Sequence, residues 1–189
     1  MIFNLPNNLT LLRIALIPFI AGLMFVGEFW AAWTAWGLYT IACVTDWLDG
    51  YLARKMKIVS AFGRFLDPIA DKLLITILLL VFAGLGKIDG LWLIPACVIM
   101  FREVLISGLR EFLGPQNIII HVSKLAKYKT FTQMIALGFL LVGDFGNWLV
   151  PDTLLIGKCL LSVSAVFTFI TGWNYMAQGI KAIVEMENK

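Results

Sequence analysis

Residues 46–71 read DWLDGYLARKMKIVSAFGRFLDPIAD and place four aspartates in a chain that is otherwise strongly apolar. Steps of three or four residues return to one face of a helix, so this stretch predicts two helical faces, each with two aspartates beside small residues. The first face holds Asp46, Asp49, Gly50 and Ala53. The second face holds Gly63, Asp67 and Asp71.

The four aspartates need a partner if they lie at membrane depth. An ionised, unpaired carboxylate costs about 2.5–3.5 kcal/mol there, so the four together cost roughly 10–14 kcal/mol. Facing carboxylates are the ligands that hard divalent cations prefer. The pattern therefore predicts a Mg²⁺ or Mn²⁺ site between two helices.

The composition is that of an integral membrane protein. Of 189 residues, 60% are hydrophobic and 14% are charged, and the mean hydropathy is +0.89, well above the range of soluble domains. We expect one all-α membrane domain over residues 1–189, a bundle of six transmembrane helices. The predicted spans are 9–27, 29–53, 61–86, 90–112, 130–149 and 154–181, each about long enough to cross a bilayer.

The N-terminal residues predict a short segment that precedes the first span. Residues 1–8 alternate apolar and polar side chains, a pattern typical of a segment lying in the membrane interface. Asn8 or Thr10 is expected to cap the helix that follows. Arg13, one turn further on, has two interpretations: it reaches out to lipid headgroups, or it contacts a phosphate-bearing ligand.

Basic residues predict the orientation. They cluster after the second, fourth and sixth spans, whereas the other connections hold two basic and four acidic residues. By the positive-inside rule, both termini and the aspartates face the cytoplasm. The basic residues of the three clusters are Arg54, Lys55, Lys57, Arg64, Arg110, Lys124, Lys127, Lys129, Lys181 and Lys189.

Two charged groups accompany the fourth span. Arg102 and Glu103 lie inside it. The structural interpretation of these charges is an ion pair within the membrane. Lys124, Lys127 and Lys129 follow in a predicted basic loop. Such a loop usually marks the cytoplasmic side of the membrane or contacts anionic lipid. Near an acidic metal site, its lysines could also bind an acceptor that carries a phosphate.

The spacing Asp46-x2-Asp49-Gly50-x2-Ala53-Arg54-x8-Gly63-x3-Asp67-x3-Asp71 resembles the signature of the CDP-alcohol phosphotransferases. This resemblance implies transfer of a substituted phosphoryl group from a CDP-linked donor to an alcohol, with CMP leaving and two Mg²⁺ or Mn²⁺ ions bound. It implies that Asp46, Asp49 and Asp67 are primary metal ligands. Asp71 is implied as the general base, and as a further ligand. The expected donor contacts are Asn8, Thr10, Arg13, Gly50, Ala53, Arg54 and Gly63; for Arg54, membership of the basic cluster is the alternative.

Three flanking segments narrow the resemblance. NLPNNLTLLRI, FREVLISGLREF and KLAKYKTFTQM are similar to segments of the bacterial phosphatidylglycerophosphate synthases. The resemblance implies CDP-diacylglycerol as donor and sn-glycerol 3-phosphate as acceptor, in a bacterial cytoplasmic membrane. Fixed cations would bind the acceptor phosphate, and the candidates are Arg110, Lys124, Lys127 and Lys129. Membrane lipid is an expected partner and nucleic acid is not; the oligomeric state stays open, a homodimer included.

Two alternatives remain at this point. The acceptor could be another alcohol: inositol phosphate, serine or phosphatidylglycerol. A divalent-cation transporter also uses intramembrane aspartates, but transporters tend to have paired repeats, and this chain concentrates its acids in one half.

Overall fold

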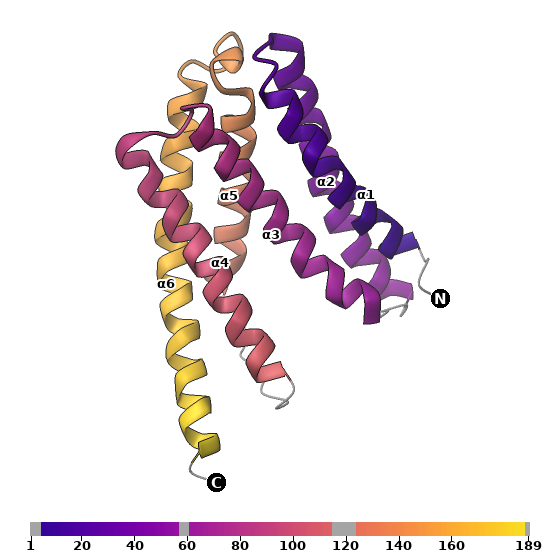
Figure 1. Ribbon diagram of the computed structural model, residues 1–189, viewed down its shortest axis with the longest axis vertical. Helices are drawn as coiled ribbons and strands as arrows, with labels where there is room; N and C mark the ends of the chain where they lie inside the picture. Colours follow the sequence, from indigo (N-terminus) through magenta and orange to yellow (C-terminus); the bar gives the residue numbers. More distant parts are fainter. Residues whose placement is uncertain (1–4, 57–60, 115–123, 188–189) are drawn as a thin grey trace. The chain divides into compact units, whose positions relative to one another are not determined.

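The structure is a computed structural model that describes residues 5–56, 61–114 and 124–187. Within these ranges the chain forms six α-helices and two short 3₁₀ helices (Figure 1). The elements are α1 Leu5–Met24, α2 Phe29–Met56, α3 Ala61–Gly84, η1 Gly90–Trp92, α4 Leu93–Leu113, α5 Lys124–Val142, η3 Gly143–Gly146 and α6 Thr153–Glu187. The predicted all-α fold is confirmed.

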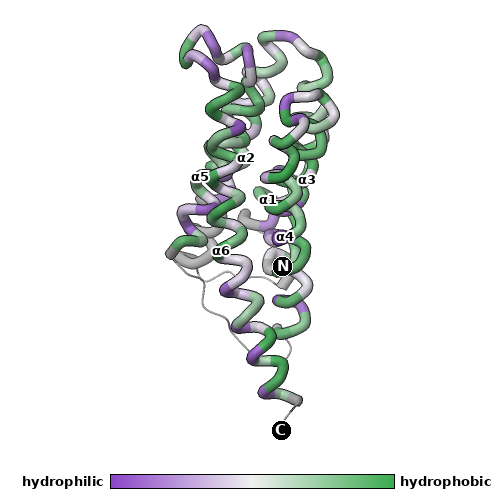
Figure 2. Tube along the Cα trace, turned by 90° about the vertical axis from the view of Figure 1, so that its left-hand side faces the viewer, coloured by the Kyte–Doolittle hydropathy of each residue, from purple (hydrophilic) through white to green (hydrophobic). Residues whose placement is uncertain are grey.

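Three of the six helices are long and apolar enough to cross a membrane by length and composition. The spans are Asn7–Met24, Gly90–Leu113 and Thr153–Met186. Phe19, Val104 and Trp173, one on each span, have 67%, 73% and 70% of their surface exposed. Large apolar side chains are mostly buried in soluble proteins, so this exposure fits helices that face lipid. Figure 2 shows hydrophobic residues along much of each helix.

The chain divides into two compact units. The first unit comprises residues 1–88 and 137–157, and the second comprises residues 89–136 and 158–189. In the first unit α1 packs against both α2 and α3, with Ile17, Ile20 and Leu78 fully buried. This packing places the first turns of α1 beside the aspartates of α2 and α3. The single domain expected from the sequence stays a prediction.

In the second unit, glycines let α4 and α6 approach closely. A Cβ atom at Gly172 would lie 2.8 Å from Cγ of Arg102, and one at Gly179 would collide with the side chain of Leu109. Small residues allow such contacts in membrane helices because they leave room for the neighbouring side chains. Arg102 and Leu109 of α4 therefore lie toward α6.

The helices begin and end differently from the prediction at two places. Helix α1 begins at Leu5, so residues 5–8 of the predicted interfacial segment are helical and its residues 1–4 lie outside the described residues. The location of this segment in the membrane interface stays a prediction. Pro6 is compatible with helix because the first-turn N–H groups need no intrahelical partner. Since Asn8 and Thr10 lie inside α1, neither caps it.

Helix α5 begins at Lys124 and ends at Val142, so the predicted basic loop is wrong from Lys124 onward. The residues KLAKYK are mostly good helix formers, and the helix extends through them. At the other end Gly143 has a φ of 57°, a conformation that favours glycine and ends helices.

Lys87 stabilises the carboxyl end of α5 within the first unit. Its Nζ donates hydrogen bonds to the carbonyl oxygens of Leu140 (2.9 Å) and Leu141 (2.8 Å). The last carbonyls of a helix have no partner in the helix itself, and a cation there is favourable. Burial nevertheless lowers the pKa of Lys87 to about 8, against a smaller opposing effect of Asp144.

The stability of the protein should therefore rise with pH above about 8. The folded chain releases the Lys87 proton near pH 8, whereas the unfolded chain keeps it until about pH 10.4. The unfolded state binds more protons in this window, so stability increases there by up to about 3 kcal/mol. Thermal unfolding of the detergent-solubilised protein should show this gain, and Lys87→Met should lack it. The same pH dependence in both proteins would contradict the assignment.

Candidate active site

Helices α2 and α3 carry the aspartates of the signature, as the spacing predicts. Asp46 and Asp49 lie in the second half of α2, and Asp67 and Asp71 lie one turn apart in α3. The backbone of Asp49, Gly50, Ala53 and Arg54 belongs to α2, but the surroundings of these four residues lie outside what the structure describes. The contacts of Asp46, Asp67 and Asp71 therefore define what the structure shows of this site.

Arg13 of α1 joins the two aspartate faces. Its Nη1 atom lies 2.5 Å from Oδ1 of Asp46 and 3.0 Å from Oδ1 of Asp71. Since both oxygens contact one nitrogen, these distances limit their separation to at most 5.5 Å. Asp46 and Asp71, 25 positions apart in the sequence, thus converge on one point.

Arg13 is buried beneath these carboxylates. Its side chain is 1% exposed, whereas those of Asp46 and Asp71 are 43% and 54% exposed. The interpretation in which Arg13 reaches out to lipid headgroups is therefore wrong. Contact with a phosphate-bearing ligand stays a prediction. The buried guanidinium leaves part of the surface of both carboxylates exposed, and a ligand can reach them there.

Asp67 is held by α1 in a similar way. The hydroxyl of Thr10 donates a hydrogen bond of 2.8 Å to Oδ1 of Asp67, and Thr10 is 1% exposed. Asn7 is also buried, at 2% exposure, and Asn7, Thr10 and Arg13 follow at steps of three residues. Asn8, the predicted donor contact, is exposed instead. The three-residue spacing is a signal that could have identified Asn7 from the sequence.

The described carboxylates fit a divalent cation in chemistry and position. Oxygen ligands suit Mg²⁺ and Mn²⁺, and a positively charged group of the protein already lies between Asp46 and Asp71. No group of three or more metal-ligating side chains is complete among the described residues. The ligand set expected from the resemblance also includes Asp49, whose side chain lies outside them. Gly63, one turn before Asp67, is buried and adds no side chain to the site.

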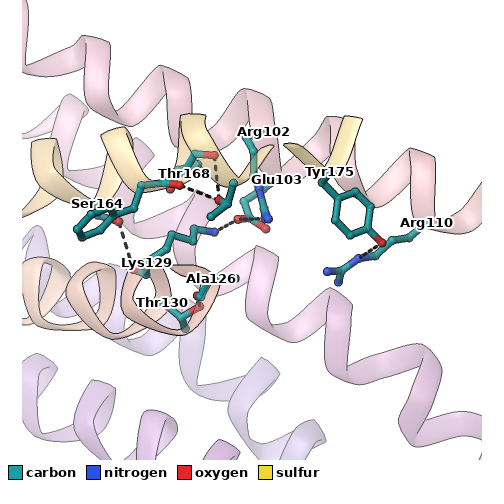
Figure 3. A network of polar contacts seen from close by, with 11 residues as sticks. Arg102, Glu103, Arg110, Ala126, Lys129, Thr130, Ser164, Thr168 and Tyr175 are labelled. Carbon is teal, nitrogen blue, oxygen red and sulfur yellow. Dashed lines mark hydrogen bonds and ion pairs between the residues drawn. The ribbon is translucent and has the colours of Figure 1, made fainter. Parts of the chain in front are cut away.

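The second unit contains a separate charged cluster (Figure 3). Arg102 Nη1 lies 3.0 Å from Oε1 of Glu103, and Nζ of Lys129 forms an ion pair with the same oxygen. The three side chains are at most 14% exposed. The predicted pairing of Arg102 with Glu103 is confirmed, and Lys129 is a partner that the sequence did not suggest. Ser164 of α6 also donates a hydrogen bond of 3.4 Å to the carbonyl oxygen of Lys129.

The other predicted acceptor contacts have different surroundings. Arg110 donates a hydrogen bond of 3.2 Å from Nε to the hydroxyl of Tyr175, and its Cζ lies 5.2 Å from the centre of that ring. Lys127 is exposed on α5, and the side chain of Lys124 lies outside the described residues. Within the described part, only Lys129 of the predicted lysines is buried.

Glu103→Gln should destabilise the protein, because it leaves Arg102 and Lys129 without their shared counter-ion. Breaking a buried ion pair costs about 3–5 kcal/mol, so a clear fall in the thermal unfolding temperature of detergent-solubilised protein is expected. Glu111→Gln is the matched control. Glu111 lies two turns further along the same helix, is exposed, and should lose less than about 0.5 kcal/mol. Equal effects of the two variants would contradict a stabilising role of the cluster.

The chain is similar in sequence to known proteins. The family described as CDP-alcohol phosphatidyltransferase matches residues 3–170. The chain is 43% identical over 175 residues to a CDP-diacylglycerol–glycerol-3-phosphate 3-phosphatidyltransferase of Rickettsia typhi, covering 91% of this chain and 94% of that protein. A protein of the same name from Cereibacter sphaeroides is 34% identical over 219 residues, covering 94% and 96%.

One relative carries a different name. A cardiolipin synthase (CMP-forming) of Oryza sativa subsp. japonica is 41% identical over 176 residues, covering 87% of this chain and 54% of that protein. The family match includes all four aspartates and the α1 residues that contact them. The chain therefore belongs to the CDP-alcohol phosphatidyltransferase family.

Proposed function

We propose that this protein transfers the phosphatidyl group of CDP-diacylglycerol to sn-glycerol 3-phosphate, which yields phosphatidylglycerophosphate and CMP. The observation that carries the proposal is the convergence of Asp46 and Asp71 on one point. The names of the Rickettsia and Cereibacter relatives support the choice of donor and acceptor. The reaction would belong to phospholipid synthesis, with phosphatidylglycerol and cardiolipin downstream.

The metal-binding role falls to Asp46, Asp49, Asp67 and Asp71, which would hold two Mg²⁺ or Mn²⁺ ions. When bound, such ions neutralise the pyrophosphate of the donor and stabilise the leaving CMP. Thr10 would fix the rotamer of Asp67 through its hydrogen bond. A ligand held in this way needs less reorganisation when the site fills.

The proton of the acceptor hydroxyl would pass to Asp71. In this step the hydroxyl oxygen forms a bond to the β-phosphorus of the donor, the bond between that phosphorus and the CMP oxygen breaks, and CMP leaves as an anion. Asp71 is the more exposed of the two described carboxylates on Arg13, at 54% against 43% for Asp46. This exposure is what a base needs in order to reach an incoming hydroxyl.

The donor would lie along the signature helices. Gly50, Ala53 and Gly63 lack bulk, so the nucleotide could approach the helix backbone closely. Thr10, Arg13 and Arg54 could contact its phosphates, and Asn8 stays a weaker prediction because it is exposed.

The acceptor phosphate would bind to basic side chains. The candidates are Arg110, Lys124, Lys127 and Lys129, since guanidinium and ammonium groups bind phosphate through charge-assisted hydrogen bonds. Lys129 is already paired with Glu103. Phosphate binding there would therefore exchange one anionic partner for another.

The six helices would all cross a bacterial cytoplasmic membrane. Helix α5, the shortest, has 19 residues and at 1.5 Å per residue spans about 28 Å, close to the thickness of the hydrocarbon core. The distribution of basic residues supports a cytoplasmic location for both termini and for the aspartates. A cytoplasmic site suits the release of a water-soluble nucleotide.

The test is an acceptor panel with purified protein, labelled CDP-diacylglycerol and Mg²⁺. Glycerol 3-phosphate should yield labelled phosphatidylglycerophosphate, and serine or inositol phosphate should yield no lipid product. Phosphatidylglycerol is the important rival acceptor, because the Oryza relative is named a cardiolipin synthase. Cardiolipin formation with glycerol 3-phosphate inert would replace the proposed acceptor with phosphatidylglycerol.

Direct transfer should also appear in the kinetics. If the acceptor attacks the donor without a covalent enzyme intermediate, both substrates must be bound before CMP leaves. Exchange of labelled CMP into CDP-diacylglycerol without acceptor, together with ping-pong kinetics, would instead indicate a nucleophilic carboxylate.

A further inference from the structure

We infer that Arg13 is the resident cation of the aspartate site: it holds Asp46 and Asp71 together in the metal-free protein and releases both when a divalent cation binds. This inference rests on the proposed function for the presence of a metal. It makes Arg13 a positioning residue whose partners differ between the empty and the loaded site.

The position of Arg13 supports a competition with metal. One nitrogen contacts an oxygen of each carboxylate, at 2.5 and 3.0 Å. An ion bonded to both oxygens at about 2.0–2.1 Å, the Mg²⁺ distance, must also lie between them. An ion that binds these oxygens from their exposed side would lie close to Nη1, so the two positive charges would repel one another and metal binding would weaken the hold of Arg13 on both carboxylates.

Burial explains why the protein needs such a cation. Arg13 is among the largest fully buried side chains of the described residues, and a buried guanidinium is costly unless it is paired. The carboxylates likewise repel one another when no cation lies between them. In the metal-free protein each charge therefore compensates the other, and α1 is tied to α2 and α3 by the same contact.

The freed guanidinium has a natural second partner. Arginine binds phosphate through two parallel N–H donors, and the donor carries a pyrophosphate next to the metal. Release from the carboxylates would leave Arg13 to pair with that anion. The exchange would join metal binding to donor binding without a new residue entering the site.

The test is the affinity of purified, detergent-solubilised protein for Mn²⁺ alone, measured by calorimetry or by the electron paramagnetic resonance signal of free Mn²⁺. Arg13→Gln removes the competitor and should bind Mn²⁺ about tenfold more tightly than the wild type. Equal or weaker binding would overturn the exchange and leave the proposed function intact. No binding to either protein would overturn the metal site itself, and the exchange with it.

Two controls separate competition from a general effect of charge. Lys181→Gln removes one positive charge from an exposed position and should leave the Mn²⁺ affinity within about twofold. High salt screens distant charges, so the tenfold ratio between Arg13→Gln and wild type should persist in 0.5 M NaCl. A ratio that disappears in salt would indicate a field effect and overturn direct competition.

Stability provides a second readout that a merely structural ion pair would not produce. Arg13→Gln should lower the unfolding temperature of the metal-free protein more than that of the Mn²⁺-saturated protein. Equal losses in both states would contradict the exchange. If Arg13→Gln does not fold, Arg13→Lys carries the test. The lysine side chain is shorter by one bond, roughly 1.3 Å, so its contacts with Asp46 and Asp71 should be looser. Arg13→Lys should therefore bind Mn²⁺ about threefold more tightly than the wild type. Unchanged or weaker binding would contradict the inference.

Discussion

Replacing Asp71 with asparagine should lower turnover at least 1,000-fold while leaving Mn²⁺-dependent binding of CDP-diacylglycerol largely intact. Asparagine is nearly isosteric with aspartate but cannot accept the hydroxyl proton, and general-base catalysis contributes roughly 10²–10⁴-fold. Because the amide oxygen of asparagine can still contact a metal, donor binding should survive, and the lost turnover should report the missing base. The measurement is the initial rate of CMP release with glycerol 3-phosphate as acceptor.

The matched control for this variant is Asp152→Asn. Asp152 is exposed and has a φ of 55°, a conformation that asparagine tolerates well, so its turnover should remain within about twofold of wild type. Activity of Asp71→Asn close to that of the control would remove Asp71 from the reaction.

Removal of divalent cations should abolish the activity. Without them the pyrophosphate of the donor and the carboxylates of the site repel one another, and the leaving CMP has no compensating charge. Dialysis against EDTA should lower the rate at least 1,000-fold, and Mg²⁺ or Mn²⁺ should restore it. Ca²⁺ is the informative comparison, since its larger size and looser coordination should restore much less activity.

A rate that survives EDTA would contradict the proposed metal centre. The thermal unfolding temperature of the EDTA-treated protein should be measured in parallel. Because Arg13 compensates Asp46 and Asp71 in the metal-free state, the protein should stay folded after dialysis, so that the lost activity can be assigned to the missing cation.

Helical periodicity predicted which aspartates share a face within each helix, Asp46 with Asp49 and Asp67 with Asp71. The meeting of the two faces was predicted from the need of the carboxylates for a shared cation, and the contacts of Asp46 and Asp71 with Arg13 agree with it. The apolar composition predicted the all-α fold in the same way. The helix faces depend on local backbone geometry and the all-α fold depends on apolar composition, and both can be read from the sequence pattern.

The partners of buried charges could not be predicted in this way. Whether Arg13 turns toward lipid or toward Asp46 depends on the rotation of α1 about its axis, and that rotation is set by the packing of α1 against α2 and α3. Similarly, Lys129 is buried because Glu103 lies opposite it. Such contacts join residues far apart in the chain, so no local pattern marks them.

Helix ends were predicted least well where polar residues are compatible with helix. The charge of the lysines before residue 130 predicts a loop, yet lysine is a good helix former and α5 begins at Lys124. Conversely, the predicted span to residue 149 ignored Gly143, whose positive φ ends α5.

The most direct test of the central claim compares wild type with Asp46→Asn in vesicles that contain labelled CDP-diacylglycerol, Mg²⁺ and glycerol 3-phosphate. The wild type should form one phosphatidylglycerophosphate for each CMP released. The variant should form neither at a measurable rate, although it folds and inserts equally well. Equal lipid product from both proteins, or Mg²⁺ flux across the vesicle without any use of CDP-diacylglycerol, would contradict transfer at these aspartates.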